Sequence, residues 1–267
     1  GTGILVRATI ADTTTTILNT MITGSTGPAF HVSGGAGLIG FNSTSTTLDP
    51  AYGSIVNGSN EAVLIEDRLG GSVNMLGSTI DDIGGTGIVI RGTGAAPTLG
   101  NITIDNASIV DNTSTGISIT NAEGNIAFRN TVNAATAIDN AAGDSVLIDG
   151  VTAGSRVTFE NLNITNPRLG GINIDNLGGS FVFTRDLVIG TPGAGAVAAP
   201  AISVANSLPT GNVSFGRNVS IQGSLGRGIE LDSNAAGSSF SINGQTTVTG
   251  AAAESIAVVG NAGTAQF

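Results

Sequence analysis

Charged and polar residues recur immediately after a repeated four-residue motif that consists of a small residue, an apolar residue, any residue and a second apolar residue. This position lies three residues after the first apolar residue. Its occupants along the chain are Glu66, Arg91, Thr120, Asp139, Asp175, Ala205 and Asp232. If successive copies lie on adjacent layers, Asp139 and Asp175 bring two carboxyl groups to about 5 Å, the separation found in retaining glycosidases. The same oxygen atoms would suit a hard cation such as Ca²⁺.

The motif copy that contains Asp139 is the least regular one. Thr136 takes the place of the first apolar residue in this copy, 19 residues after Ile117 and 36 residues before Ile172. An inserted loop could therefore separate Asp139 from Asp175. Aspartates in turns also commonly bond to their own backbone. We expect neither a catalytic nor a metal-binding role for these two residues, which are nevertheless the sequence's best candidates for either, and we expect no cofactor.

Other chemistry-bearing residues are scarce. The chain has no cysteine, tryptophan or lysine. Its one histidine, His31, lies far from most of the acidic residues along the predicted β-helix, so we expect its side chain to be solvated. The glycines of 92–94 and 193–195 lack the strand and helix that a phosphate-binding loop requires. Tyr52 is the one aromatic residue expected to be exposed to a sugar. The loops at 41–60 and 191–200 have no assigned ligand.

The elements that position these residues are repeats. The first residues of the ten motif copies are Gly3, Ala29, Ala62, Gly87, Gly116, Ala135, Gly171, Ala201, Gly228 and Ser255. Ile256 lies 252 residues after Ile4, and the nine intervals between them have a mean length of 28 residues. Self-similarity with a period in this range is typical of repeat architectures.

Each repeat predicts three short strands. The motif itself alternates apolar and other residues, as a half-buried strand does. A second alternating run follows a turn, for example at 126–128, 157–159 and 213–215, and a further apolar residue follows that run. No helical periodicity is present. The sequence therefore predicts an all-β parallel β-helix of about ten coils, with Phe128, Phe159, Phe183 and Phe215 in its core.

Asparagines recur four residues after the first apolar residue of the motif. The four are Asn121, Asn140, Asn176 and Asn206. We predict that they point inward from successive coils and form a structural ladder, because each amide supplies both a donor and an acceptor to the amide above it.

The charge balance excludes two classes of partner. Nineteen acids and nine arginines give a net charge of −10, without the basic stripe that nucleic acid or an anionic membrane surface would need. No apolar run approaches the ~20 residues of a membrane span. The lack of cysteine fits an extracellular protein stabilised by stacking. Because the chain opens and closes inside repeats, we expect one β-solenoid domain over 1–267, either a fragment of a longer protein or a unit that stacks end to end.

The Gly-Ile-x-Ile-x-Asn motif of 116–121 and 171–176 resembles right-handed parallel β-helix proteins. That group includes pectate-lyase-like enzymes, autotransporter passengers and large bacterial surface adhesins, and the chain is most similar to the repeats of large secreted bacterial proteins. The resemblance implies an extracellular structural or adhesive rod. The Asn-Thr-Asp, Gly-His-Gly and Arg-Ile-Lys motifs of polygalacturonase-like enzymes are absent.

We therefore predict a non-catalytic surface stalk or fibre-forming subunit. Its expected partners are other copies of the chain, joined head to tail, and a polysaccharide or cell surface. Two alternatives remain: a polysaccharide lyase or glycoside hydrolase that acts on an outward face of the β-helix, and a viral tail-fibre or spike segment.

Overall fold

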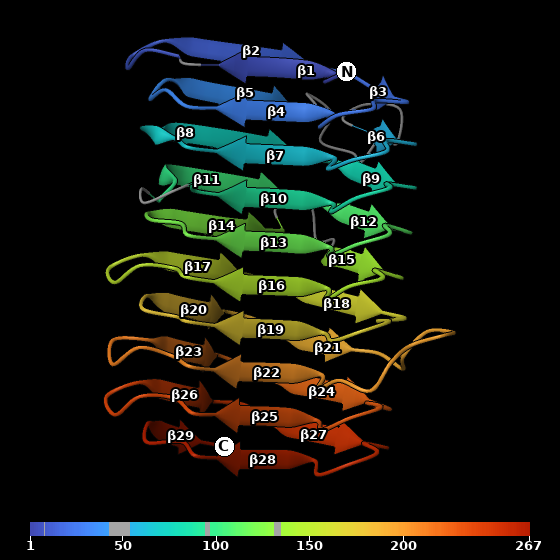
Figure 1. Cartoon of the computed structure of the whole chain (residues 1–267), viewed down its shortest axis with the longest axis vertical. Helices are drawn as coiled ribbons and strands as arrows, with labels where there is room; N and C mark the ends of the chain where they lie inside the picture. The colour runs from blue at the N-terminus through green and yellow to red at the C-terminus, as the bar shows by residue number, and fades with distance from the viewer. Residues whose placement is uncertain (8, 43–53, 94–96, 131–134) are drawn as a thin grey trace.

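Three parallel sheets, which we call A, B and C, make up the protein. The computed structural model describes residues 1–7, 9–42, 54–93, 97–130 and 135–267. Within these residues, sheets A and B contain ten strands each and sheet C contains nine. Each passage of the chain adds one strand to each sheet, so that the coils stack along one axis from the N-terminus to the C-terminus (Figure 1). The predicted parallel β-helix of about ten three-stranded coils is confirmed.

The strand bounds follow the repeat. Sheet A contains β1 (Ile4–Arg7), β4 (Phe30–Ser33), β7 (Val63–Glu66), β10 (Ile88–Arg91), β13 (Ile117–Thr120), β16 (Val146–Asp149), β19 (Ile172–Asp175), β22 (Ile202–Ala205), β25 (Ile229–Asp232) and β28 (Ile256–Val259). Sheet B contains β2 (Thr14–Leu18), β5 (Leu38–Asn42), β8 (Leu69–Leu76), β11 (Leu99–Asp105), β14 (Asn125–Arg129), β17 (Arg156–Phe159), β20 (Ser180–Phe183), β23 (Asn212–Phe215), β26 (Ser239–Ile242) and β29 (Thr264–Gln266). Sheet C contains β3 (Ile22–Thr23), β6 (Ile55–Val56), β9 (Thr79–Asp81), β12 (Ser108–Val110), β15 (Thr136–Asp139), β18 (Leu162–Thr165), β21 (Leu187–Ile189), β24 (Val219–Gln222) and β27 (Thr246–Thr249).

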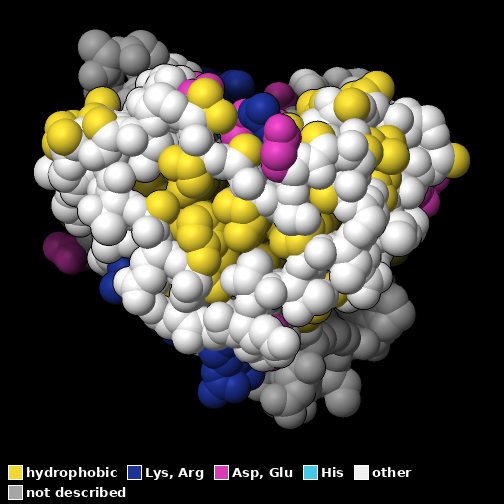
Figure 2. Space-filling model, turned by 90° about the horizontal axis from the view of Figure 1, so that it is seen from below, with side chains coloured by type: hydrophobic (Ala, Val, Ile, Leu, Met, Phe, Trp, Pro, Cys, Tyr) yellow, Lys and Arg dark blue, Asp and Glu magenta, His cyan; other side chains and the backbone are white. Residues whose placement is uncertain are grey.

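The core fills the space between the three sheets. In β13, Ile117 and Ile119 are fully buried, whereas the alternate residues Ser118 and Thr120 face outward and stay partly exposed. Figure 2 looks along the axis from the C-terminal end and shows hydrophobic side chains at the centre, ringed by polar side chains and backbone. The predicted core phenylalanines of sheet B are all fully buried.

A small residue precedes each strand of sheet A because two other chain segments approach it closely. A Cβ on Gly116 would lie 2.6 Å from the carbonyl oxygen of Ser145, one coil away, and 2.8 Å from Ile138 Cγ2 of sheet C. Real side chains do not approach so closely, and forcing extra atoms into a packed interior costs about 1–3 kcal/mol. The clash explains glycine at Gly116, and other coils make room for nothing larger than alanine or serine at this position.

One coil differs from its prediction. Thr136–Asp139 forms β15 of sheet C, and the sheet A strand that follows it is β16. The motif copy expected at 135–138 was therefore wrong, because strands of both sheets bury alternate residues and look alike over three residues. Ser145-Val146-Leu147-Ile148 is the true copy, with Val146 lying 29 residues after Ile117 and 26 before Ile172.

Candidate functional site

The outer face of sheet A gathers most of the residues that the sequence offered for chemistry. The last residue of each strand forms one column, in which parallel pairing places each residue directly beside its counterpart one coil away. In the order of the coils the column contains Arg7, Ser33, Glu66, Arg91, Thr120, Asp149, Asp175, Ala205, Asp232 and Val259. Asp149 holds the place that the sequence gave to Asp139.

Asp139 and Asp175 do not meet, so the predicted carboxylate pair is wrong. Asp139 ends β15 in sheet C, where its register partners are Val110 and Thr165. Its Oδ1 accepts hydrogen bonds of 2.8 Å from Thr165 Oγ1 and 2.8 Å from Asn166 Nδ2. Asp139 therefore joins one coil to the next on a different face of the molecule.

Asp149 and Asp175 are the adjacent pair that the sequence analysis missed. They are register partners of β16 and β19. Asn176 Nδ2 donates to Asp149 Oδ1 at 3.0 Å, and Asn206 Nδ2 donates to Asp175 Oδ1 at 2.9 Å. In each bond an amide on one coil holds a carboxylate on the coil before it, so both acids take part in coil-to-coil bonding.

The asparagine ladder differs from its prediction in direction and in partners. Asn176 and Asn206 are exposed rather than buried, and their Nδ2 atoms bond to aspartates rather than to each other. Asn121, Asn176 and Asn206 have φ values of 46°, 51° and 51°. Asparagine tolerates this left-handed backbone conformation better than most residues, so the turn selects it at this position.

Asn140 belongs to another turn. It follows β15 in sheet C and donates from Nδ2 to Asp111 Oδ1 at 2.6 Å. Gly150 occupies the corresponding place after β16 in sheet A, with a φ of 68°. The predicted four-membered ladder is therefore divided between two columns, and both columns use an asparagine to reach an acceptor one coil away.

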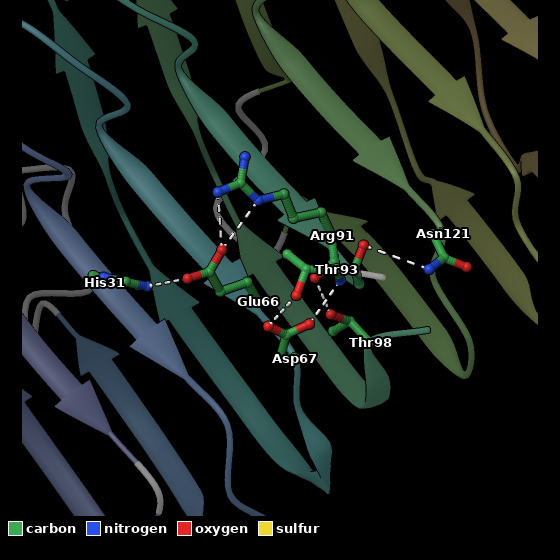
Figure 3. Close-up of polar contacts among 8 residues, drawn as sticks. His31, Glu66, Asp67, Arg91, Thr93, Thr98 and Asn121 are labelled. Atoms are coloured by element: carbon green, nitrogen blue, oxygen red, sulfur yellow. Dashed lines mark hydrogen bonds and ion pairs between the residues drawn. The ribbon is translucent and has the colours of Figure 1, made fainter. Parts of the chain in front are cut away.

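A second cluster, His31, Glu66 and Arg91, lies on β4, β7 and β10 of sheet A (Figure 3). His31 Nε2 is 2.9 Å from Glu66 Oε1, and Arg91 contacts Glu66 Oε2 through Nε at 3.1 Å and Nη2 at 2.9 Å. The side chains of His31 and Glu66 are only 13 % and 15 % exposed. The expectation of a solvated His31 was wrong. Its register partner on the next coil is Leu64, and its side chain reaches Glu66, two residues further along that strand.

Asp67 and Thr93 extend this cluster at the edge of the sheet. Thr93 donates to the Asp67 carboxylate twice, from its backbone N at 2.6 Å and from Oγ1 at 2.5 Å. The side-chain bond from Thr93, followed by the backbone bond and the nearby Arg91 charge, lowers the pKa of Asp67 below its ordinary value near 3.8. The charged carboxylate therefore stabilises the folded state.

This pKa shift predicts a pH-dependent effect of Thr93→Val. The substitution removes the Oγ1 donor, so the pKa of Asp67 should rise toward its ordinary value. Because the folded-state pKa is depressed, the stabilisation is present above pH 4 and is lost as the pH falls through the folded-state value. The wild type should exceed Thr93→Val in unfolding free energy by less than about 1 kcal/mol at neutral pH, since the site is exposed. NMR titration of the Asp67 carboxyl carbon checks this, and an unchanged pKa would contradict it.

The described residues hold no group of three histidine, aspartate or glutamate side chains that could bind a metal ion. None of them forms a helix long and apolar enough to cross a membrane. Tyr52 and most of the 41–60 loop lie outside the described residues.

Comparison with known proteins agrees with this geometry. A family model for the right-handed β-helix region matches residues 51–198, more than half of the 267-residue chain. No curated protein and no solved structure matches the chain. The family match and the three stacked parallel sheets together establish that the chain belongs to the right-handed β-helix family.

Proposed function

We propose that the chain is a non-catalytic, extracellular rod with a structural or adhesive role. The observation that supports it most is the use made of the polar side chains on sheet A. The bonds from His31 to Glu66, Asn176 to Asp149 and Asn206 to Asp175 each join neighbouring coils. These side-chain bonds therefore link the coils along the axis, as the backbone hydrogen bonds between parallel strands do.

The core supports the same role. Side chains of equivalent positions stack from coil to coil, as in the pairing of Phe128 with Phe159, whose ring centroids are 4.4 Å apart. In such a solenoid the stability is approximately the sum of the intrinsic stabilities of the coils and of the interfaces between neighbouring coils, so coils can be added without loss of stability. An extracellular location is consistent with a chain that contains no cysteine and relies on stacking.

Incubation with polysaccharides tests this proposal. We expect the purified chain to release no new chain ends from any neutral or acidic polysaccharide, including any polysaccharide that it binds. A polysaccharide-cleaving enzyme is the competing function, because Asp149 and Asp175 lie on adjacent strands. Release of ends by the wild type would support that enzyme.

A further inference from the structure

One connection between sheets C and A is twice as long as the others. Eight of these connections contain six residues each: 24–29, 57–62, 82–87, 111–116, 140–145, 166–171, 223–228 and 250–255. The connection from β21 to β22, 190–201, contains twelve. It projects beyond the line of the other turns (Figure 1). Since six residues suffice to close the coil elsewhere, the additional residues are not needed for the fold. Insertions in a repeat commonly form a binding face.

The insertion forms one wall of a pocket on the outer face of sheet A. The pocket has a volume of about 190 Å³. Asn173 on β19 and Ser203 on β22 are register partners and supply its floor. Ala199 and Pro200 of the insertion, together with Leu169 of the preceding turn, supply apolar walls.

Asp144 supplies the charged group of the pocket and is held in place on both oxygen atoms. Its Oδ1 accepts a hydrogen bond from Gly170 N at 3.2 Å, and its Oδ2 accepts one from Asn173 Nδ2 at 3.1 Å. Each carboxylate oxygen keeps a further lone pair for another donor. A Cβ on Gly170 would lie 2.5 Å from Asp144 Oδ1, so a larger residue there would require the carboxylate to move.

Two polar atoms of the floor are available to a ligand. Among the residues that the structure describes, neither Ser203 Oγ nor Asn173 Oδ1 has a hydrogen-bond partner. The pocket therefore combines hydroxyl, amide and carboxylate groups with an apolar wall. Small-molecule sites typically have this composition, a few fixed polar groups in mainly apolar surroundings.

We propose that this pocket binds one neutral pyranose ring of a glycan, an inference that rests on the adhesive role proposed above. The C–H face of a sugar ring suits Leu169 and Pro200, and its hydroxyl groups suit Asp144, Asn173 and Ser203. A uronic acid would bring a second carboxylate beside Asp144, and like charges at short range are strongly disfavoured. The pocket is smaller than the ~300–1,000 Å³ of sites for larger ligands, which limits it to a single ring.

A shortened connection tests the proposal. Replacing 190–201 by the sequence of the regular turn 111–116 removes the pocket wall and leaves a turn that the fold uses in eight coils. Binding to methyl hexosides, and to neutral glucan, mannan and galactan, would be measured by titration for the wild type and the variant. We expect at least tenfold weaker binding of the preferred sugar by the variant, with its circular dichroism and unfolding midpoint retained.

Two point variants provide a matched comparison. Ser203→Ala should weaken binding, whereas Ser118→Ala, at the same strand position on β13 but outside the pocket, should not. Glycan binding that both the shortened connection and Ser203→Ala leave unchanged would overturn the pocket assignment and keep the adhesive role. Absence of any neutral-sugar binding by the wild type would overturn the pocket assignment too. Cleavage of a glycan would instead overturn the proposed non-catalytic function.

Discussion

Replacing Phe159 by alanine is expected to lower the free energy of unfolding by about 3–5 kcal/mol, the usual cost of truncating a buried aromatic residue. Phe159 is fully buried. Its ring stacks on Phe128 at 4.4 Å and on Phe183 at 5.3 Å, and it contacts Phe181 at 5.7 Å. The substitution therefore opens a cavity in the middle of a stack, where no neighbour can move in without leaving its own coil. Urea denaturation followed by circular dichroism measures the loss.

Phe267→Ala is the control for this substitution. Phe267 contacts Phe240 at the last coil but remains 48 % exposed. Its truncation leaves no enclosed cavity, so we expect a loss of about 1 kcal/mol or less. Equal losses for the two variants would show that the stacked core does not determine stability, which would contradict the structural account.

Replacing Arg68 by methionine is expected to destabilise the fold by about 3 kcal/mol or more. Arg68 is 1 % exposed and lies between β7 and β8. Its guanidinium donates at 2.6 Å to the carbonyl oxygens of both Gly34 and Gly37, and at 3.0 Å to that of Gly70. Methionine fills much of the space but leaves the buried carbonyl group of Gly37 and the partly buried carbonyl groups of Gly34 and Gly70 without these donors. A buried acceptor left without a donor costs about 1–3 kcal/mol, and a partly buried one costs less.

Charge and geometry can be separated at this position. Burial lowers the pKa of the Arg68 guanidinium. Arg68→Lys keeps the charge but replaces the planar five-donor group by a single ammonium, which cannot match the same set of acceptors. We expect Arg68→Lys to fall between wild type and Arg68→Met. Arg156→Met, on the exposed start of β17, should change stability by less than about 0.5 kcal/mol. Methionine variants at 68 and 156 with equal stability would contradict the role assigned to Arg68.

The sequence was sufficient to predict the sheets because a β-helix repeats one simple pattern in every coil. Alternating apolar residues identified sheet A, and the runs at 126–128, 157–159 and 213–215 identified sheet B. The pattern failed at 135–139, where a sheet C strand also buries alternate residues. The spacing alone would have selected Val146 over Thr136, since its intervals of 29 and 26 residues are close to the mean of 28.

The polar contacts were less predictable because they run diagonally between coils. His31 bonds to Glu66, although its register partner on β7 is Leu64. Asn176 bonds to Asp149, a residue that the sequence analysis left out of the column because it placed Asp139 there. The burial of Arg68 could not be predicted from the spacing of charged residues, because a guanidinium that donates to backbone carbonyl groups needs no acidic partner. Such contacts depend on the stagger of side chains across a formed sheet.

The most direct test of the central claim is an assay for polysaccharide cleavage. Wild type and the Asp149→Asn, Asp175→Asn double variant would be incubated with acidic and neutral polysaccharides, while both bound protein and newly released chain ends are measured. The account predicts that neither protein releases ends and that any glycan binding by the wild type persists in the double variant, since both acids bond coil to coil. Release of ends by the wild type that the double variant loses would contradict it and identify sheet A as an active site.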